Sequence, residues 1–509
     1  MVSPPPGQRG GSVANGHYTL PRFNGQQWWR LDVESGKYTL VRLAGPDHPA
    51  ETRAPVRVSG DAPLWRLEYH LPEWPLPIAA EILVGQDGAA WISSAVGGWQ
   101  RLRALVPPAP ALAGEWQVAA SEPDTLETVA FAPEETRLGR RPKLPSVWVD
   151  PEGATAAALL DFEGSVLELR FDGVAGAWAV ALPQTETVAL YRGAAPSWAN
   201  AVARRGQPPG PIGSRGARYA IVQEKALGEL LFDGAAARVV ASDGKLMAEY
   251  AVVGGGGPFV DLEMSERRES LPAHATLAGT GGELQLWDTQ HPRPRSTWAV
   301  FGTTTVGALA GRWSVSILHP GEVAPPHALE LTERTARVTI ANGRVLTATA
   351  WVVGAPARPM LLLRGLESRG GPESVHVFDV TELDRSFVLT ERTDDGQRRA
   401  AWLLHRGGAP TWAPAERLEA DLAALCPVGQ AWQQEGPPGQ WPEILSRQTG
   451  DQRRLLGLAA HVMVESLSVV AAMDPGGVQG VYDQTRASFG LPAAKCPFVE
   501  AVAAAAARR

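Results

Sequence analysis

Cysteine is scarce in this chain, and so are the signals that send a protein across or into a membrane. Only Cys426 and Cys496 occur in 509 residues, too few for the disulfide framework of a small secreted scaffold. The opening Met1-Val-Ser-Pro-Pro-Pro-Gly lacks the charged and apolar regions of a secretory signal. The longest apolar stretch, 455–473, contains a histidine and a glutamate, which a membrane span rarely holds. We therefore expect an intracellular protein, in the cytoplasm or a plastid, without an integral membrane span.

A positive field that would attract nucleic acid or an anionic membrane is also missing. The formal net charge is −7, which disfavours both partners. The basic clusters at 137–143 and 204–205 adjoin proline and glycine residues, so we predict that both are solvated loops. Nucleic acid is therefore not an expected partner.

Catalytic and metal-binding motifs are absent as well. The ten histidines are scattered without the spacing of a metal site. No nucleophile elbow, phosphate loop or dinucleotide fingerprint occurs, and Gly254–Gly257 is predicted to be a hairpin loop. Asp261 and Glu263 alternate along one predicted strand and are expected to be solvated rather than catalytic. We name no catalytic residue and no metal ligand, and we favour a protein that is not an enzyme.

The chain does contain an internal repeat, in which a glycine and a nearby aromatic residue precede a run of short alternating strands. The copies lie roughly 90 to 100 residues apart, a spacing that suits small closed β-barrels. Tryptophan is abundant, with 18 residues against 7 tyrosines, as is typical of barrels whose ends are closed by large rings. The four copies are Gly25-Gln-Gln-Trp28-Trp29, Gly114-Glu-Trp116, Gly216-Ala-Arg-Tyr219 and Gly311-Arg-Trp313.

The third and fourth copies match best. Residues 237–250 align without a gap on 336–349, and both contain Asp-Gly or Asn-Gly at the same point. Those dipeptides favour a two-residue hairpin turn. The fourth unit contains about eight closely spaced strands, which favours an up-and-down meander that closes into a barrel.

The predicted fold class is therefore mainly β, with tandem antiparallel up-and-down barrels followed by a helical domain. Helical periodicity begins at Ala413, and further helices are predicted near Trp441, over 451–473 and over 499–509. The predicted boundaries are a disordered N-terminus at 1–20, barrel units at 21–106 and 111–193, a linker at 194–213, barrel units at 214–302 and 308–407, and a helical region at 412–509.

The Gly-x-Trp opening, with an arginine on the last strand of the same unit, resembles the lipocalin-like (calycin) barrels. In that family the arginine stacks over the tryptophan at the closed end, a cation–π contact. The resemblance implies such floors for Trp116 with Arg192 and Trp313 with Arg406, and less clearly for Trp29 with Arg103. The third unit departs from the pattern, because Tyr219 replaces the tryptophan and no arginine ends its last strand.

Three segments are similar to the uncharacterised lipocalin-like domains of cyanobacteria and plastid-bearing algae. They are Leu112–Trp116, Asp384–Glu391 and Arg399–Arg406. Relatives of those domains include lyases that attach bilin pigments to light-harvesting proteins. The resemblance implies a photosynthesis-related role and a tetrapyrrole, carotenoid or lipid as the bound molecule.

Two pairs of residues are candidate ligand contacts. Trp351 and Trp402 could line a cavity for a flat apolar ligand, although packed barrel cores use tryptophan in the same way. Cys426-Pro427 and Cys496-Pro497 could each present a thiolate to haem, whereas the simpler interpretation is two buried thiols at helix ends.

Three functions remain open on the sequence alone. The first is a non-catalytic tandem-barrel protein that binds a small apolar or pigment-like ligand. The second is an assembly subunit with filled barrels, which binds other protein subunits through its C-terminal helices. The third, with least support, is a pigment lyase.

Overall fold

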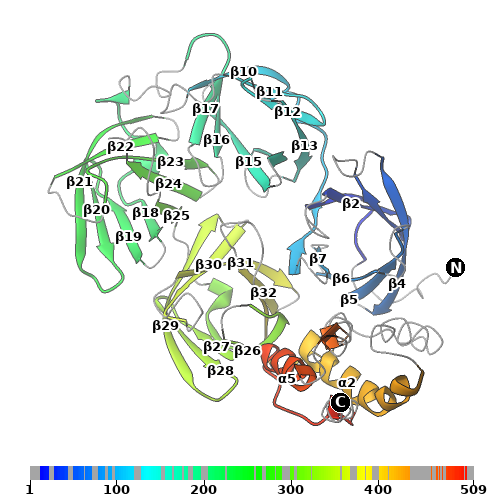
Figure 1. Cartoon of the computed structure of the whole chain (residues 1–509). Helices are drawn as coiled ribbons and strands as arrows, with labels where there is room; N and C mark the ends of the chain where they lie inside the picture. The colour runs from blue at the N-terminus through cyan, green and yellow to red at the C-terminus, as the bar shows by residue number, and fades with distance from the viewer. Residues whose placement is uncertain are drawn as a thin grey trace.

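Four antiparallel barrel units follow one another along the chain, and a helical region follows the fourth. The structure is a computed structural model, and it describes residues 12–435 apart from short segments between strands, together with parts of 460–500. Each sheet is a meander in which neighbouring strands are consecutive in sequence. Figure 1 shows the four units arranged in a ring, with helices beside the first and the fourth. The predicted fold class, mainly β with tandem antiparallel barrels and C-terminal helices, is confirmed.

Barrel 1 begins earlier than the sequence suggests. Residues 16–20 were expected to be disordered, but they belong to a strand that pairs with the next strand and with Arg103–Ala104. Tyr18 and Leu20 point into the barrel core, and this burial explains why the segment is ordered. The edges of the nine-stranded sheet are consecutive in the chain and separated by Leu102 alone, so the sheet wraps onto itself. Its strands are β1 (Gly16–Pro21), β2 (Trp28–Glu34), β3 (Lys37–Arg42), β4 (Thr52–Asp61), β5 (Leu64–Tyr69), β6 (Ile78–Val84), β7 (Ala90–Ser94), β8 (Gly98–Arg101) and β9 (Arg103–Ala104).

Barrel 2 is a closed eight-stranded barrel. Its interior holds three aromatic rings in mutual contact, with Trp148 stacked on Phe171 at 5.6 Å between centroids and Phe131 edge-on to both. Its strands are β10 (Gly114–Ala119), β11 (Thr128–Phe131), β12 (Glu135–Leu138), β13 (Lys143–Val149), β14 (Ala156–Phe162), β15 (Ser165–Val174), β16 (Ala177–Ala181) and β17 (Thr187–Tyr191).

Barrel 3 is likewise closed with eight strands. A one-turn 3-10 helix, η2 (Pro211–Gly213), precedes it. The Asp243-Gly244 turn joins two of its strands, as the sequence predicts, and Gly244 adopts a positive φ of 86°. Its strands are β18 (Arg218–Gln223), β19 (Ala226–Phe232), β20 (Ala236–Ala241), β21 (Leu246–Gly256), β22 (Phe259–Met264), β23 (His274–Thr280), β24 (Glu283–Asp288) and β25 (Trp298–Gly302).

Two predictions about the outer wall of barrel 3 are wrong. Arg204 is buried rather than solvated. Its guanidinium donates to both carboxylate oxygens of Asp261 at 2.9 Å, so Asp261 is half-buried and paired rather than solvated. Gly254 lies within β21 rather than in a hairpin loop, and a Cβ there would come 2.5 Å from the carbonyl oxygen of Arg204. Because Gly254 and Gly255 have no side chain, the segment around Arg204 and Pro209 can lie directly against this strand. Arg205 remains exposed.

Barrel 4 is the third closed eight-stranded barrel, and the 3-10 turn η3 (Gly307–Leu309) precedes it. Its interior contains the largest cluster of buried apolar residues among those described. Its strands are β26 (Gly311–His319), β27 (Pro326–Leu331), β28 (Thr335–Ile340), β29 (Val345–Ala355), β30 (Arg358–Arg364), β31 (Val375–Leu383), β32 (Ser386–Glu391) and β33 (Ala401–His405).

The outer walls of consecutive barrels pack on each other through apolar patches. Trp28 of barrel 1 packs near Ala157 of barrel 2, and Ala189 of barrel 2 near Phe259 of barrel 3. Where two barrels meet, the strands therefore carry apolar side chains on both faces, one toward the barrel interior and one toward the neighbouring barrel.

Barrel 4 also packs on barrel 1, and this contact closes the ring of Figure 1. Trp91 and Trp99 of barrel 1 belong to the same buried patch as Leu318 and Leu403 of barrel 4. The indole N–H of Trp99 donates to the carbonyl oxygen of Leu318 at 3.0 Å. Every barrel unit therefore contacts two others.

The helical region contains α2 (Pro414–Glu435) and α5 (Val478–Ser488). Helix α2 packs beside β26, and the Arg417 guanidinium lies 4.0 Å from the Glu81 carboxylate of barrel 1. The helices predicted near Trp441, over 451–459 and over 501–509 lie outside the described residues. Among the described residues, no helix combines the length and apolar character needed to cross a membrane.

The cysteine predictions are wrong. Cys426 and Cys496 form a disulfide, so neither is a thiol that could ligate haem. Cys426 does not end a helix either, because α2 continues through Pro427 to Glu435. The disulfide lies in a buried cluster with Leu422 and Tyr482, and this packing outweighs the low helix propensity of proline.

Candidate binding site in the fourth barrel

The floor of barrel 4 is built from the repeated Gly-x-aromatic motif. The Arg406 guanidinium carbon lies 4.5 Å from the centroid of the Trp313 ring, and the indole N–H of Trp313 donates to the carbonyl oxygen of Leu309 at 2.8 Å. Gly311 adopts a φ of +109°, which disfavours any residue with a side chain. The motif thus turns the chain sharply so that the ring caps the barrel.

Barrel 2 repeats this geometry. Arg192 lies 4.1 Å from the Trp116 ring centroid, and the Trp116 indole N–H donates to the carbonyl oxygen of Leu112 at 2.8 Å. A Cβ on Gly114 would lie 3.1 Å from the Arg192 guanidinium, so the glycine also makes room for the arginine. The structure therefore brings both tryptophan–arginine pairs together.

The other two barrels use tyrosine. In barrel 3 the Tyr219 hydroxyl donates to the carbonyl oxygen of Ile212 at 2.9 Å. In barrel 1 the Tyr18 hydroxyl donates to the carbonyl oxygen of Ala14 at 2.9 Å. The first copy of the motif is therefore Gly16-His17-Tyr18 on β1, and the prediction that it lies at Gly25–Trp29 is wrong.

The prediction that Trp29 and Arg103 pair at the floor of barrel 1 is wrong, because the two side chains lie on opposite faces of its wall. Trp29 points inward, with its ring centroid 6.1 Å from that of Tyr69. Arg103 reaches toward barrel 2, where its Nη1 donates to Glu168 Oε1 at 3.1 Å and its Nη2 donates to the carbonyl oxygen of Asp150. Arg103 thus tethers two barrels.

The two candidate ligand contacts of barrel 4 lie on opposite faces of its wall. Trp402 points inward and is 2% exposed, with its ring centroid 4.6 Å from that of Phe378. Trp351 points outward into the contact with barrel 3, so the prediction that it lines the cavity is wrong. Its residue number explains this, because inward residues of β29 have even numbers. Arg334 covers the ring at 4.8 Å.

Two ionisable side chains that the sequence did not mark as candidates point into barrel 4. His376 on β31 and Glu391 on β32 are 8% and 6% exposed. His376 Nδ1 lies 2.7 Å from Glu391 Oε1. Their positions share the inward parity of Phe378 and Leu389, which lie in the barrel core. This parity is the signal that the sequence offered, since both residues interrupt otherwise apolar inward rows.

The pair lies at the end of barrel 4 opposite the floor. Strand β33 defines three levels, because its inward residues pair in turn with neighbours on β26 and β32. Near the floor, Leu404 is paired with Val315 and Phe387. In the middle of the barrel, Trp402 is paired with Ile317 and Leu389. At the far end, the carbonyl of Ala400 accepts a hydrogen bond from the Glu391 N–H. Phe387 in turn meets Trp313 of the floor at 5.3 Å between ring centroids.

Each member of the pair has an unused polar atom. Within the described part of the chain, His376 Nε2 and Glu391 Oε2 are buried without a hydrogen-bond partner. A buried polar atom left unsatisfied costs about 1–3 kcal/mol, so native proteins rarely keep two side by side. The far end of barrel 4 is thus an apolar enclosure with two free hydrogen-bonding positions.

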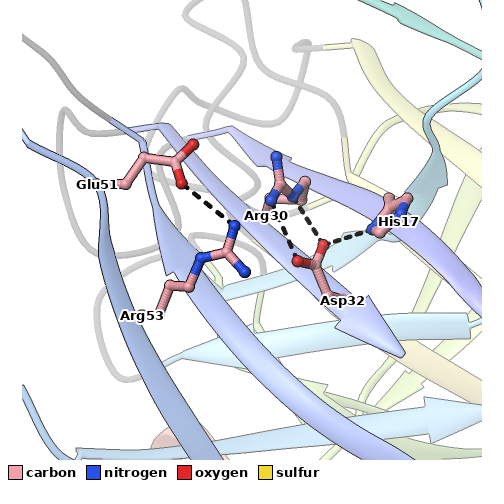
Figure 2. Close-up of polar contacts among 5 residues, drawn as sticks. All are labelled: His17, Arg30, Asp32, Glu51 and Arg53. Atoms are coloured by element: carbon pink, nitrogen blue, oxygen red, sulfur yellow. Dashed lines mark hydrogen bonds and ion pairs between the residues drawn. The ribbon is translucent and has the colours of Figure 1, made fainter. Parts of the chain in front are cut away.

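A second polar cluster lies on the outer wall of barrel 1 (Figure 2). Asp32 accepts hydrogen bonds from Arg30 Nε and Arg30 Nη2 at 2.7 and 3.1 Å, and its Oδ1 lies 2.7 Å from His17 Nδ1. Burial acts to raise the pKa of Asp32, but these hydrogen bonds and the charge of Arg30 outweigh it and lower the pKa. Beside them, Arg53 and Glu51 form an exposed ion pair at 3.5 Å. The cluster is a surface ion-pair network, for which about 1 kcal/mol or less per pair is usual.

No group of three or more histidine, cysteine, aspartate or glutamate side chains among the described residues is arranged to hold a metal ion.

Comparisons with known proteins give no identity for the chain. No family model and no curated protein matches it. Among solved structures, it is similar to the DNA polymerase III subunit beta of Pseudomonas aeruginosa, with 8% identity over 57% of this chain and 93% of that one and a TM-score of 0.11. The H. pylori beta clamp in complex with diflunisal is 7% identical over 58% of this chain and 92% of that one, with a TM-score of 0.11. The sliding clamp of Caulobacter crescentus is 10% identical over 70% of this chain and 91% of that one, with a TM-score of 0.09. Scores this low carry no argument about fold or function.

Proposed function

We propose that the chain is a non-catalytic binding protein that holds a small apolar molecule with a polar group in barrel 4. The observation that carries the proposal is the buried His376–Glu391 pair with its two free polar atoms. Binding sites for small molecules are mostly apolar with a few placed polar groups. A ligand would satisfy Nε2 and Oε2, which otherwise weaken the fold.

The position of the pair supports the same proposal. The Trp313–Arg406 contact closes the opposite end of the barrel, so a ligand at the far end would rest on Trp402 and Phe378, which form the middle of the core. A pigment, carotenoid or lipid, as the lipocalin-like resemblance implies, falls within this chemical class.

The test is extraction of the purified full-length protein with organic solvent, followed by absorbance and mass spectrometry. We expect a small molecule at close to one per chain from the wild type and a loss of at least tenfold from His376→Leu/Glu391→Leu. The matched control is Thr136→Val/Ser146→Val, which replaces the interior polar pair of barrel 2 and leaves barrel 4 unchanged.

Equal recovery from wild type and the barrel 4 variant would contradict this site. An empty extract from every variant, together with failure to take up any of the probes described below, would contradict ligand binding altogether. The assembly-subunit alternative would then take its place.

A further inference from the structure

The His376–Glu391 pair also specifies the kind of polar group that the ligand carries, an inference that rests on the proposed function. The pair is enclosed by apolar neighbours on the inner wall. Leu363 is the cross-strand partner of His376, Phe378 lies at 6.5 Å from the His376 ring, and Ala400 is bonded to Glu391 through the backbone. The apolar cluster inside the barrel includes Leu363, Phe378 and Ala400, all of which lie beside this pair.

An apolar enclosure favours a pair with no net charge, because an isolated buried charge is far more costly than a neutral hydrogen-bonded pair. Zero net charge means that histidine and glutamate share two protons. One proton lies between Nδ1 and Oε1, which are 2.7 Å apart. The other is on Nε2 or on Oε2.

Both proton positions present the ligand with the same pattern. With the second proton on Nε2, that nitrogen donates and Oε2 accepts; with the proton on Oε2, the roles are exchanged. Either way the free edge offers one donor and one acceptor. A hydroxyl matches this edge, since its O–H donates and its oxygen lone pairs accept.

We infer that barrel 4 selects a neutral, apolar molecule bearing a hydroxyl group, and that the His376–Glu391 edge binds this hydroxyl by donating to it and accepting from it. Ethers satisfy only half of the edge. An ammonium group offers donors alone and leaves the donor of the pair unsatisfied. A hydrocarbon leaves both atoms of the pair without partners, at the cost of burial described above.

The test measures binding of four matched probes to the folded full-length protein by equilibrium dialysis, after exhaustive dialysis has removed any small molecule that it already holds. The probes are 2-naphthol, 2-methoxynaphthalene, naphthalene and 2-naphthylmethylammonium. We expect 2-naphthol to bind most tightly, by about tenfold over the ether and more over the hydrocarbon, because one net hydrogen bond of about 1.4 kcal/mol corresponds to tenfold.

Two variants separate recognition from mere filling of space. In Glu391→Gln the free edge still offers one donor and one acceptor, one from the amide and the other from His376 Nε2, and it carries no charge, so the preference for 2-naphthol should persist. In His376→Leu/Glu391→Leu the preference should disappear, while naphthalene binds at least as well as before.

The outcomes distinguish this inference from the proposed function. Equal binding of 2-naphthol and naphthalene overturns the hydroxyl preference but leaves a binding protein. Tightest binding of 2-naphthylmethylammonium shows that the pair carries net negative charge, which also overturns the inference alone. If a molecule is extracted that lacks a hydroxyl, its structure decides against the inference as well.

Discussion

Barrels 2 and 4 share strand number, topology and a tryptophan–arginine floor, yet their interiors treat polar groups differently. In barrel 2 the interior hydroxyls of Thr136 and Ser146 are bonded to each other at 3.0 Å. The remainder of its core is apolar, with Phe131, Trp148 and Phe171 in mutual ring contact, although the Trp148 indole Nε1 is also buried without a hydrogen-bond partner. In barrel 4 the interior polar pair leaves one atom unused on each member.

The difference shows which barrel is suited to be only a structural unit. A satisfied hydroxyl pair adds modestly to stability and needs nothing else. An ionisable pair with free atoms is a cost unless something else uses those atoms. The same architecture thus holds a self-paired hydroxyl pair in barrel 2 and, in barrel 4, the ionisable pair that we propose as a binding site.

The largest expected effect comes from the two interior tryptophans. Trp148→Ala in barrel 2 should lower the free energy of unfolding by about 3–5 kcal/mol, as is typical of large core truncations, without changing the binding of 2-naphthol. Trp402→Ala in barrel 4 should have a similar effect on stability and should also weaken binding of 2-naphthol. Thermal unfolding with hydrogen exchange of each barrel, together with dialysis, measures both. Loss of binding in Trp148→Ala would break the distinction between the barrels.

A smaller effect is expected at Glu168, which lies on the outer wall of barrel 2 and pairs there with Arg103 and Arg170. Burial acts to raise its pKa, but the charges and hydrogen bonds of Arg170 and Arg103 outweigh this and lower the pKa to about 2. Because the folded pKa lies below the value of 4.5 in the unfolded chain, the contribution is complete above about pH 4.5 and is lost as the pH falls through 2. It amounts to roughly 3 kcal/mol at most.

Glu168→Gln tests this account. Its deficit in unfolding free energy relative to wild type should be largest at neutral pH and should shrink to less than half by about pH 3. The deficit is measured by denaturant unfolding across that range. A deficit that stays constant with pH would show that Arg103 and Arg170 do not act through the carboxylate charge.

The smallest effects are expected at the two floors, where the barrels are alike. Arg192→Ala and Arg406→Ala should each cost about 0.5–1 kcal/mol, since both arginines are exposed cation–π partners. Neither change should alter the binding of 2-naphthol, because the His376–Glu391 pair lies at the other end of barrel 4. Unequal costs would show that the two floors differ in more than sequence position.

The repeated barrels were predictable because short alternating strands and Asp-Gly or Asn-Gly turns are local signals. Gly114, Gly311 and their aromatic partners were likewise readable, since a positive φ restricts the residue type. The first copy was misplaced because Tyr18 is a less conspicuous aromatic residue than the Trp28-Trp29 pair.

What the sequence could not reveal depends on contacts between distant segments. The Trp351 ring faces out of barrel 4 into the contact with barrel 3. Both faces of β29 are buried and apolar there, so the alternation of the strand alone does not say whether the odd or the even residues face the interior. Cys426 and Cys496 are 70 residues apart, so their pairing follows from how the helices pack. Finding the proposed binding edge required knowing that β31 and β32 bring His376 and Glu391 together.

The hydrogen bond from Trp99 to Leu318 joins residues 219 positions apart, which has a consequence for synthesis on the ribosome. Barrel 1 emerges from the ribosome and can fold long before barrel 4 is translated. Trp91 and Trp99 therefore stay exposed to solvent until the wall of barrel 4 forms and covers them. Nascent chains that stall inside barrel 4 would present that bare indole surface to one another. Premature termination there should therefore produce insoluble protein, even though the first three barrels are complete.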